Sequence, residues 1–175
     1  MGELQHAALH KSSAFCALQR QLSRQVALVI RQLRNRLMKS SIKWVDNVQF
    51  VAETGSGHAV VIDGAPEYGG RNTGARPMEL VLAGAASCTA FDVVLMLKKS
   101  RQNFTSLHVD ADAVRAETDP KVFTAIKLTF RVAGKGLDPA AVERAVKLSK
   151  EKYCSATAML GKTAEIVTEI VLSEA

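Results

Sequence analysis

Two cysteines are the side chains of this sequence best suited to chemistry. Cys88 stands in the middle of the apolar stretch MELVLAGAASCTAFDVVLML, and Cys154 follows 66 residues later in KEKYCSAT. A deprotonated thiol is a nucleophile, whereas a buried thiol is often only a small core hydrophobe. Cys88 is therefore core filler, half of a structural disulfide, part of a membrane span or the working atom of a site.

The number of cysteines argues against a disulfide scaffold. Cys16 makes the total three, with no CxxC pair and no secretory signal peptide. This usage is typical of thiols in a reducing compartment, so we expect a cytoplasmic protein. The four histidines pair with no cysteine or acid at ligand spacing. We therefore expect neither a metal site nor a bound cofactor.

Residues 78–97 are long and apolar enough to raise the question of a membrane span. Glu79 and Asp92 argue against one, because an acid inside a bilayer is costly. A helix that is apolar on every side must be buried on every side, yet a two-layer domain covers only one of its faces. The run Gly84-Ala85-Ala86 allows backbones to approach closely. The sequence thus predicts a homodimer with this helix at its centre.

The other elements must position this helix, and their order predicts an α+β domain with an antiparallel sheet packed on two helices. Alternating apolar residues indicate strands, and a glycine-rich stretch with two prolines indicates an irregular loop. The expected elements are a hairpin of strands 41–54 and 58–64, a loop over 64–77, a helix over 77–102, strands 106–114 and 123–134, a helix over 138–160, and a strand over 164–175.

The second helix has a clear beginning. Asp138 suits the N-cap position and Pro139 the first helical residue. The residues expected to face inward from this helix are Val142, Ala145, Val146, Ser149, Tyr153, Ala156 and Leu160. This single helix would carry Cys154.

Charge is distributed unevenly along the chain. Residues 1–37 hold six Lys/Arg against one acid, and residues 38–175 hold 17 against 16. The body of the chain therefore shows no basic footprint, and we expect no nucleic-acid partner.

Residues 1–37 have the pattern of a basic amphipathic helix. We interpret them as a segment appended to a domain over residues 38–175. Contact with an anionic membrane surface, or a role as a transit peptide, would involve only this segment.

The motifs RPMELVLAGAASCTAFDVV and EKYCSA resemble the OsmC/Ohr family of thiol-dependent hydroperoxide reductases, and most closely its YhfA-like branch. The similarity covers about residues 39–174. The resemblance implies the fold of that family, an intertwined homodimer with sites at the subunit interface.

The resemblance also implies an activity. The thiolate of Cys88 would attack the peroxide O–O bond and become a sulfenic acid, and Cys154 would condense with it to a disulfide. The implied substrate is an organic hydroperoxide, and a dithiol reductant would reset the enzyme. The implied biological role is defence against oxidative stress.

The residues that activate the thiol in this family are absent from the matching positions of this sequence. The position of the family's Glu, directly after the helix-start proline, is Met78, and the opening hairpin lacks the family's Arg. Arg71, Arg76 and Glu79 are the candidate substitutes. Glu79 lies nine residues before Cys88, on the opposite face of the helix.

A second hypothesis involves no catalysis. Under this hypothesis the chain is an OsmC-like dimer whose interface pocket holds a small apolar ligand, or whose thiols sense the redox state. A depressed pKa at Cys88, with Cys154 close by, would favour the enzyme. A Cys88 without a nearby cation would favour the binding protein.

Overall fold

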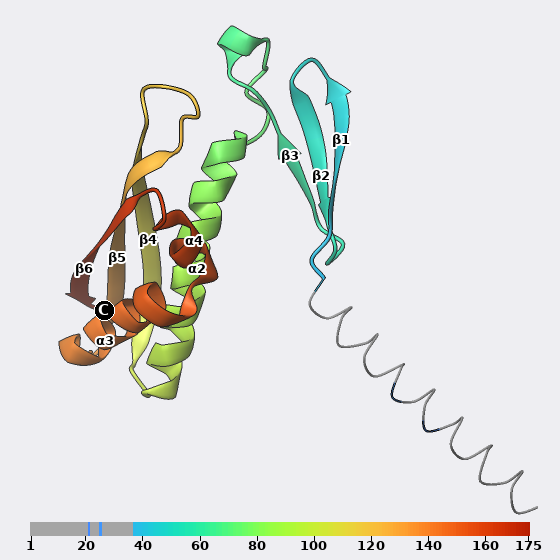
Figure 1. Cartoon of the computed structure of the whole chain (residues 1–175). Coiled ribbons are helices and arrows are strands. Elements are labelled where there is room, and N and C mark those ends of the chain that lie inside the picture. Colours follow the sequence, from blue (N-terminus) through green and yellow to red (C-terminus); the bar gives the residue numbers. More distant parts are fainter. Residues whose placement is uncertain (1–20, 22–24, 26–36) are drawn as a thin grey trace, which may run out of the picture. The chain divides into compact units, whose positions relative to one another are not determined.

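The computed structural model describes residues 37–175, together with Gln21 and Gln25 (Figure 1). The amphipathic helix expected over residues 1–37 lies almost entirely outside the described residues, and so does Cys16. The chain divides into two compact units, Met1–Val61 and Ile62–Ala175.

The first sheet has three strands in the order β1 (Ser40–Asp46), β2 (Gln49–Thr54) and β3 (Ala59–Ile62). The expectation of a single strand over 41–54 was wrong, because β1 and β2 form a hairpin of their own. Their turn has Asn47 at φ 45, and asparagine tolerates the left-handed region. The Trp44 indole N–H donates to the Asn47 carbonyl at 2.8 Å across this turn.

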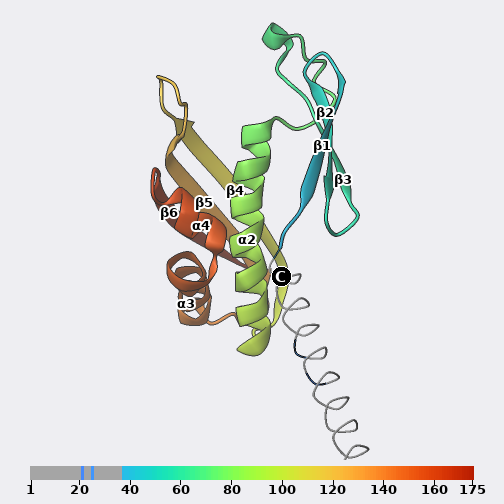
Figure 2. The same cartoon turned by 45° about the vertical axis from the view of Figure 1, so that its right-hand side comes forward.

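The predicted central helix is α2 (Pro77–Lys99). Pro77 is its first residue, as expected, and its C-terminal end comes three residues earlier than the predicted Gln102. Figure 2 shows α2 running along the sheet formed by β4, β5 and β6. Its buried face consists of Ala85, Ala86, Thr89, Val93 and Leu97.

The second sheet has the order β4 (Phe104–Arg115), β5 (Phe123–Gly134) and β6 (Glu165–Glu174). β4 and β5 pair antiparallel as predicted. β6, however, pairs parallel with β5, so the sheet is mixed and the antiparallel expectation was wrong for this strand. A parallel neighbour requires a crossover connection, which the helical segment 139–160 supplies.

The second helix is not continuous. It divides into α3 (Pro139–Leu148), a π-helical turn (Ser149–Tyr153) and α4 (Ser155–Leu160). Cys154 has φ −74 and ψ 106, so extended backbone interrupts the helix there. The π-helical turn also changes the direction in which the following side chains point from the helix axis. Tyr153, which was expected to face inward, is therefore 53% exposed.

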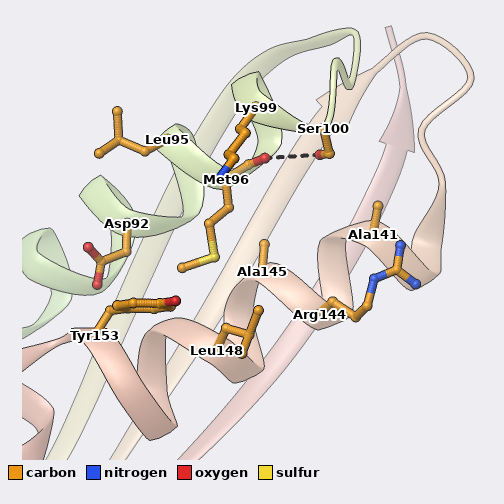
Figure 3. Close-up of a pocket in the computed structure, with 10 residues that line it drawn as sticks. All are labelled: Asp92, Leu95, Met96, Lys99, Ser100, Ala141, Arg144, Ala145, Leu148 and Tyr153. Carbon is orange, nitrogen blue, oxygen red and sulfur yellow. Dashed lines mark hydrogen bonds between the residues drawn. The ribbon is translucent and has the colours of Figure 1, made fainter.

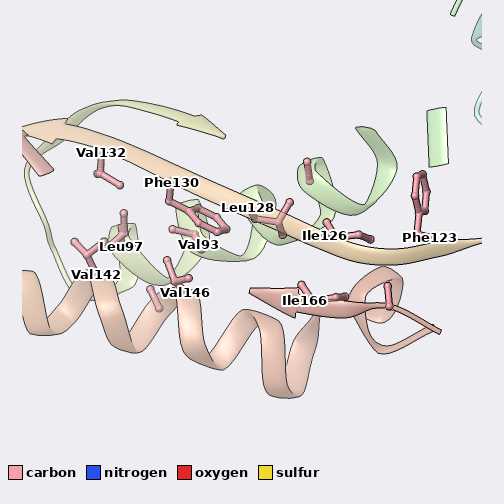
Figure 4. Close-up of a cluster of buried hydrophobic side chains, with 13 residues drawn as sticks. Val93, Leu97, Phe123, Ile126, Leu128, Phe130, Val132, Val142, Val146 and Ile166 are labelled. Atoms are coloured by element: carbon pink, nitrogen blue, oxygen red, sulfur yellow. The ribbon is translucent and has the colours of Figure 1, made fainter. Parts of the chain in front are cut away.

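The core lies where α2 and α3 cover the second sheet (Figure 4). Alternate residues of β5 point into it, because successive side chains of a strand face opposite sides. These are Ile126, Leu128, Phe130 and Val132, each at most 1% exposed. They meet Val93 and Leu97 of α2 and Val142 and Val146 of α3. The fold is α+β, as the order of elements predicted.

Candidate thiol site

The fold brings the two predicted cysteines together. Cys88 lies midway along α2, and Cys154 is the N-cap residue of α4. The two side chains are in hydrogen-bonding contact, and both are free thiols. The place of Cys88 in the middle of the most apolar stretch predicts that it is the more buried of the two thiols. This prediction is wrong, because Cys154 is 2% exposed and Cys88 is half-buried.

Both sulfur atoms face the first turn of α4. The N–H of Thr157 donates to Cys154 Sγ at 3.4 Å, and the N–H of Ala156 donates to the Cys88 sulfur. First-turn amides of a helix have no partner inside the helix and are free to bind an acceptor. The break at Cys154 thus creates the donors that hold the thiol pair.

The surroundings of Cys88 nevertheless favour its protonated form. Burial raises the pKa of the Cys88 thiol most, and the hydrogen bond with Cys154 and the charge of Asp92 raise it further. The Ala156 N–H lowers that pKa but does not offset the other effects. In this chain alone, Cys88 is a resting thiol and not a thiolate.

Asp92 lies one helical turn beyond Cys88 and is fixed from the other helix. The buried hydroxyl of Ser149 donates to Asp92 Oδ2 at 3.0 Å. Sequence reasoning treated Ser149 only as an inward-facing position and therefore missed this contact. No signal in the sequence could reveal it, because the π-helical turn sets the direction of the serine.

The loop before α2 carries the candidate arginines and is organised by Asp63, which is 1% exposed. Asp63 accepts hydrogen bonds from the N–H groups of Gly64, Arg71 and Thr73 and from the Thr73 hydroxyl, at 2.8 to 3.1 Å. These donors, led by the Thr73 N–H and opposed by burial, lower the pKa of Asp63 to about 2. The sequence analysis did not identify Asp63.

Arg76 and Glu79 interact with each other at the beginning of α2. The Arg76 N–H donates to Glu79 Oε2 at 2.9 Å, and the side chains form an ion pair at 3.8 Å. At about 1.5 Å per residue, Arg76 lies roughly 18 Å along the helix from Cys88. Within one chain neither residue reaches the thiols. Activation by Arg71, Arg76 or Glu79 stays a prediction, and for Arg76 and Glu79 it would require a second subunit.

α2 is long and apolar enough to cross a membrane by length and composition, with a mean hydropathy of 2.0. The core helix of a globular domain passes the same test, and α2 packs on the second sheet through one face. Among the residues that the structure describes, no group of three or more His, Cys, Asp and Glu could hold a metal ion.

The fold and the paired thiols place the chain in a known class. The chain belongs to the OsmC-like protein family, whose pattern matches residues 70–169. Protein YhfA of Escherichia coli (strain K12) is 43% identical over 132 residues, which cover 74% of this chain and 93% of YhfA. The resemblance to the YhfA-like branch is thereby confirmed.

Solved structures share the fold. A hypothetical protein from Aquifex aeolicus VF5 is 27% identical with a TM-score of 0.70, and the match covers 79% of this chain and 98% of that one. The organic hydroperoxide resistance protein OhrB of Bacillus subtilis is 20% identical with a TM-score of 0.53, covering 77% and 97%. At that identity the likeness to OhrB concerns the fold alone.

Proposed function

We propose that this protein reduces organic hydroperoxides with its paired thiols and so contributes to peroxide resistance. The observation that carries this proposal is the contact between the Cys88 and Cys154 side chains, on two helices far apart in the sequence. Membership of the OsmC-like family supports it, and the Bacillus subtilis neighbour that shares the fold is an organic hydroperoxide resistance protein.

The proposed reaction has three steps. The Cys88 thiolate attacks one peroxide oxygen, the O–O bond breaks, and the alkoxide takes a proton and leaves as an alcohol. Cys88 is then a sulfenic acid. The Cys154 sulfur attacks the Cys88 sulfur, water leaves, and a disulfide forms. An external dithiol exchanges with this disulfide, restores both thiols and is itself oxidised.

The half-buried Cys88 is the attacking thiol in this scheme, because a peroxide can approach it more readily than the buried Cys154. Cys154 is held by the Thr157 N–H beside the sulfur that it must attack. An apolar setting on α2 favours an organic peroxide over hydrogen peroxide.

A homodimer is part of the proposal. Val81, Phe91 and Leu95 are 42%, 65% and 51% exposed in the single chain. With Gly84 they share the side of α2 opposite its buried face, since residues follow at about 100° around a helix. A second copy would cover this side. It would also bring a cation, from Arg71 or Arg76, toward Cys88.

One observation favours the second function, a non-catalytic dimer that binds a small apolar ligand or senses the redox state. Within residues 37–175, no cation is among the main influences on the pKa of Cys88, which is raised. A protonated thiol reacts slowly with peroxides.

Consumption of cumene hydroperoxide in the presence of a dithiol distinguishes the two functions. The enzyme requires turnover by the wild type and none by Cys88→Ser. If the wild type and Cys88→Ser both consume the peroxide only at the background rate, the binding function is supported and the enzyme is not.

A further inference from the structure

Asp92 places a negative charge beside the thiol that the proposed reaction uses. It follows Cys88 by four residues on α2, and side chains at this spacing share a helix face with their Cβ atoms about 5–6 Å apart. The charge of Asp92 acts on the sulfur, because it raises the pKa of the Cys88 thiol. A molecule that reaches the sulfur therefore comes within the field of this carboxylate.

The carboxylate is held in place from the other helical segment. The hydroxyl of Ser149, which is 0% exposed, donates to Asp92 Oδ2 at 3.0 Å. Asp92 and Tyr153 of the π-helical turn line one groove, so the carboxylate lies where α2 meets that turn (Figure 3). A short side chain held by a buried donor keeps its charge at one position beside the thiol.

The charge of Asp92 is not neutralised within the part of the chain that the structure describes. Among residues 37–175, Asp92 forms no ion pair, whereas the carboxylates of Asp110 and Glu169 each pair with a cation. The basic residues of α2 begin at Lys98, roughly 9 Å further along the helix axis. Asp92 thus presents an uncompensated negative charge to the thiol site.

We propose that Asp92 is a specificity-determining residue, which makes Cys88 select against anionic substrates. A hydroperoxide that carries a carboxylate is repelled as it approaches the sulfur, whereas a neutral one is not. The substrate class follows from this selection together with the proposed function, on which it rests: an organic hydroperoxide without a negative charge. An arginine from a second copy would act in the opposite direction, so the effect of Asp92 is measured by removing its charge alone.

The selection does not depend on which side of α2 a second copy covers. Asp92 and Cys88 belong to one helix, so their spacing is the same in the monomer and in the dimer. Every path by which a peroxide reaches the sulfur ends within about one helical turn of Asp92. Selection by charge also differs from tuning of the thiol, because a changed pKa alters the reactions with neutral and anionic reagents alike.

Two alkylating reagents of nearly the same shape test the selection without any peroxide. Iodoacetamide is neutral, iodoacetate is an anion, and both react with the thiolate. Peptide mass spectrometry of the full chain measures the rate of each at Cys88, at low ionic strength, where charges are least screened. The ratio of the two rates cancels the fraction of thiolate, which is the same for both reagents.

Asp92→Asn should lower the ratio of the iodoacetamide rate to the iodoacetate rate about threefold or more. Coulomb's law gives this factor for two unit charges roughly 6 Å apart, even with the dielectric constant of bulk water. Asparagine keeps the size of the side chain and can still accept from Ser149, so the fold should be retained, as circular dichroism will verify. The matched control is Asp112→Asn, which removes the same charge from β4 opposite Lys127 and should leave the ratio unchanged.

The same comparison with peroxides tests the substrate class. Cumene hydroperoxide and its para-carboxylate derivative are the neutral and the anionic substrate, and a dithiol is the reductant. The wild type should have the higher kcat/KM for the neutral peroxide, and Asp92→Asn should reduce that preference. A preference that stays the same in Asp92→Asn would overturn the substrate class.

The alkylation result separates this selection from the proposed function. An alkylation ratio that Asp92→Asn leaves unchanged, or that Asp112→Asn lowers equally, would overturn the role of Asp92. A Cys88 that iodoacetamide fails to modify even at alkaline pH would overturn it too, because no substrate could then reach the sulfur. A lowered ratio without turnover of either peroxide would overturn the proposed function and leave the charge selection at Cys88 standing.

Discussion

The Ser149 hydroxyl, on the π-helical turn, donates a 3.0 Å hydrogen bond to Asp92 on α2, one turn beyond Cys88. This bond fixes a carboxylate near the thiol pair and connects α2 with the π-helical turn that precedes Cys154. The charge of Asp92 opposes ionisation of Cys88. Because the pKa of the Cys88 thiol is raised, the proposed peroxide reduction requires a further group that favours the thiolate.

Replacing Asp92 with asparagine should make Cys88 more reactive. The substitution keeps the size of the side chain and removes the negative charge, which lowers the pKa of the Cys88 thiol. The pH midpoint of Cys88 alkylation by iodoacetamide should move to lower pH. Asp112→Asn, on β4, is the control and should leave the midpoint in place. An unchanged midpoint in Asp92→Asn would show that Asp92 does not tune the thiol.

The candidate arginines should act only across a dimer. We expect Arg71→Ala or Arg76→Ala to raise the pH midpoint of Cys88 alkylation in the dimer, because a lost cation disfavours the thiolate. Dilution until the wild type dissociates should abolish the difference. Identical midpoints for the wild type and both variants in the dimer would mean that neither arginine activates Cys88.

The buried Asp63 should make stability depend on acid pH. The pKa of Asp63 is lowered to about 2 in the fold, so its contribution is present at neutral pH. That contribution is lost as the pH falls from the ordinary carboxyl range toward 2.

Urea unfolding of the wild type and Asp63→Asn measures this contribution. The variant should be less stable at pH 7, and the difference should shrink as the pH approaches 2. Thr73→Val removes one hydroxyl donor and should show a smaller effect of the same kind. A difference that is the same at pH 7 and pH 3 would assign the loss to packing instead of to the carboxylate.

The exposed side of α2 should form the dimer. Phe91→Asp replaces a 65% exposed aromatic ring with a charge. Burial of a phenylalanine contributes roughly 1.5–3 kcal/mol, so the variant should dissociate at least about tenfold more readily.

Size-exclusion chromatography with light scattering measures the dimer. Val114→Asp, at the end of β4 where the valine is 61% exposed, is the matched control and should stay dimeric. A wild type that is a stable monomer at micromolar concentration would contradict the proposed assembly.

Local signals in the sequence predicted helix beginnings and buried strands well. Pro77 begins α2, and Asp138 with Pro139 begins α3, because proline and a capping side chain specify a helix N-terminus through nearby atoms. The strand 123–134 was predicted with its exact bounds by its alternating pattern.

Features that depend on distant contacts could not be predicted in this way. Nothing local indicates that β6 runs parallel to β5, since an alternating pattern fits either direction. The break at Cys154 lies in a segment without glycine or proline, so no local signal indicates it. Asn47, directly after Asp46, was a turn signal that the interpretation of 41–54 as one strand overlooked.

The sequence predicted the two cysteines of the candidate site but not the residues that support them. Residue type identified Cys88 and Cys154, and family resemblance connected them. Ser149 and Asp63 were not identified, because their roles arise from the directions of side chains that only the fold determines.

The central claim is that Cys88 and Cys154 form one redox couple. Its most direct test is mass spectrometry of the protein after a stoichiometric pulse of cumene hydroperoxide, with digestion in the absence of reductant. We predict a peptide pair joined by a Cys88–Cys154 disulfide. In Cys154→Ser we predict a Cys88 sulfenic acid that dimedone traps. Finding both cysteines of the wild type unmodified would contradict the account.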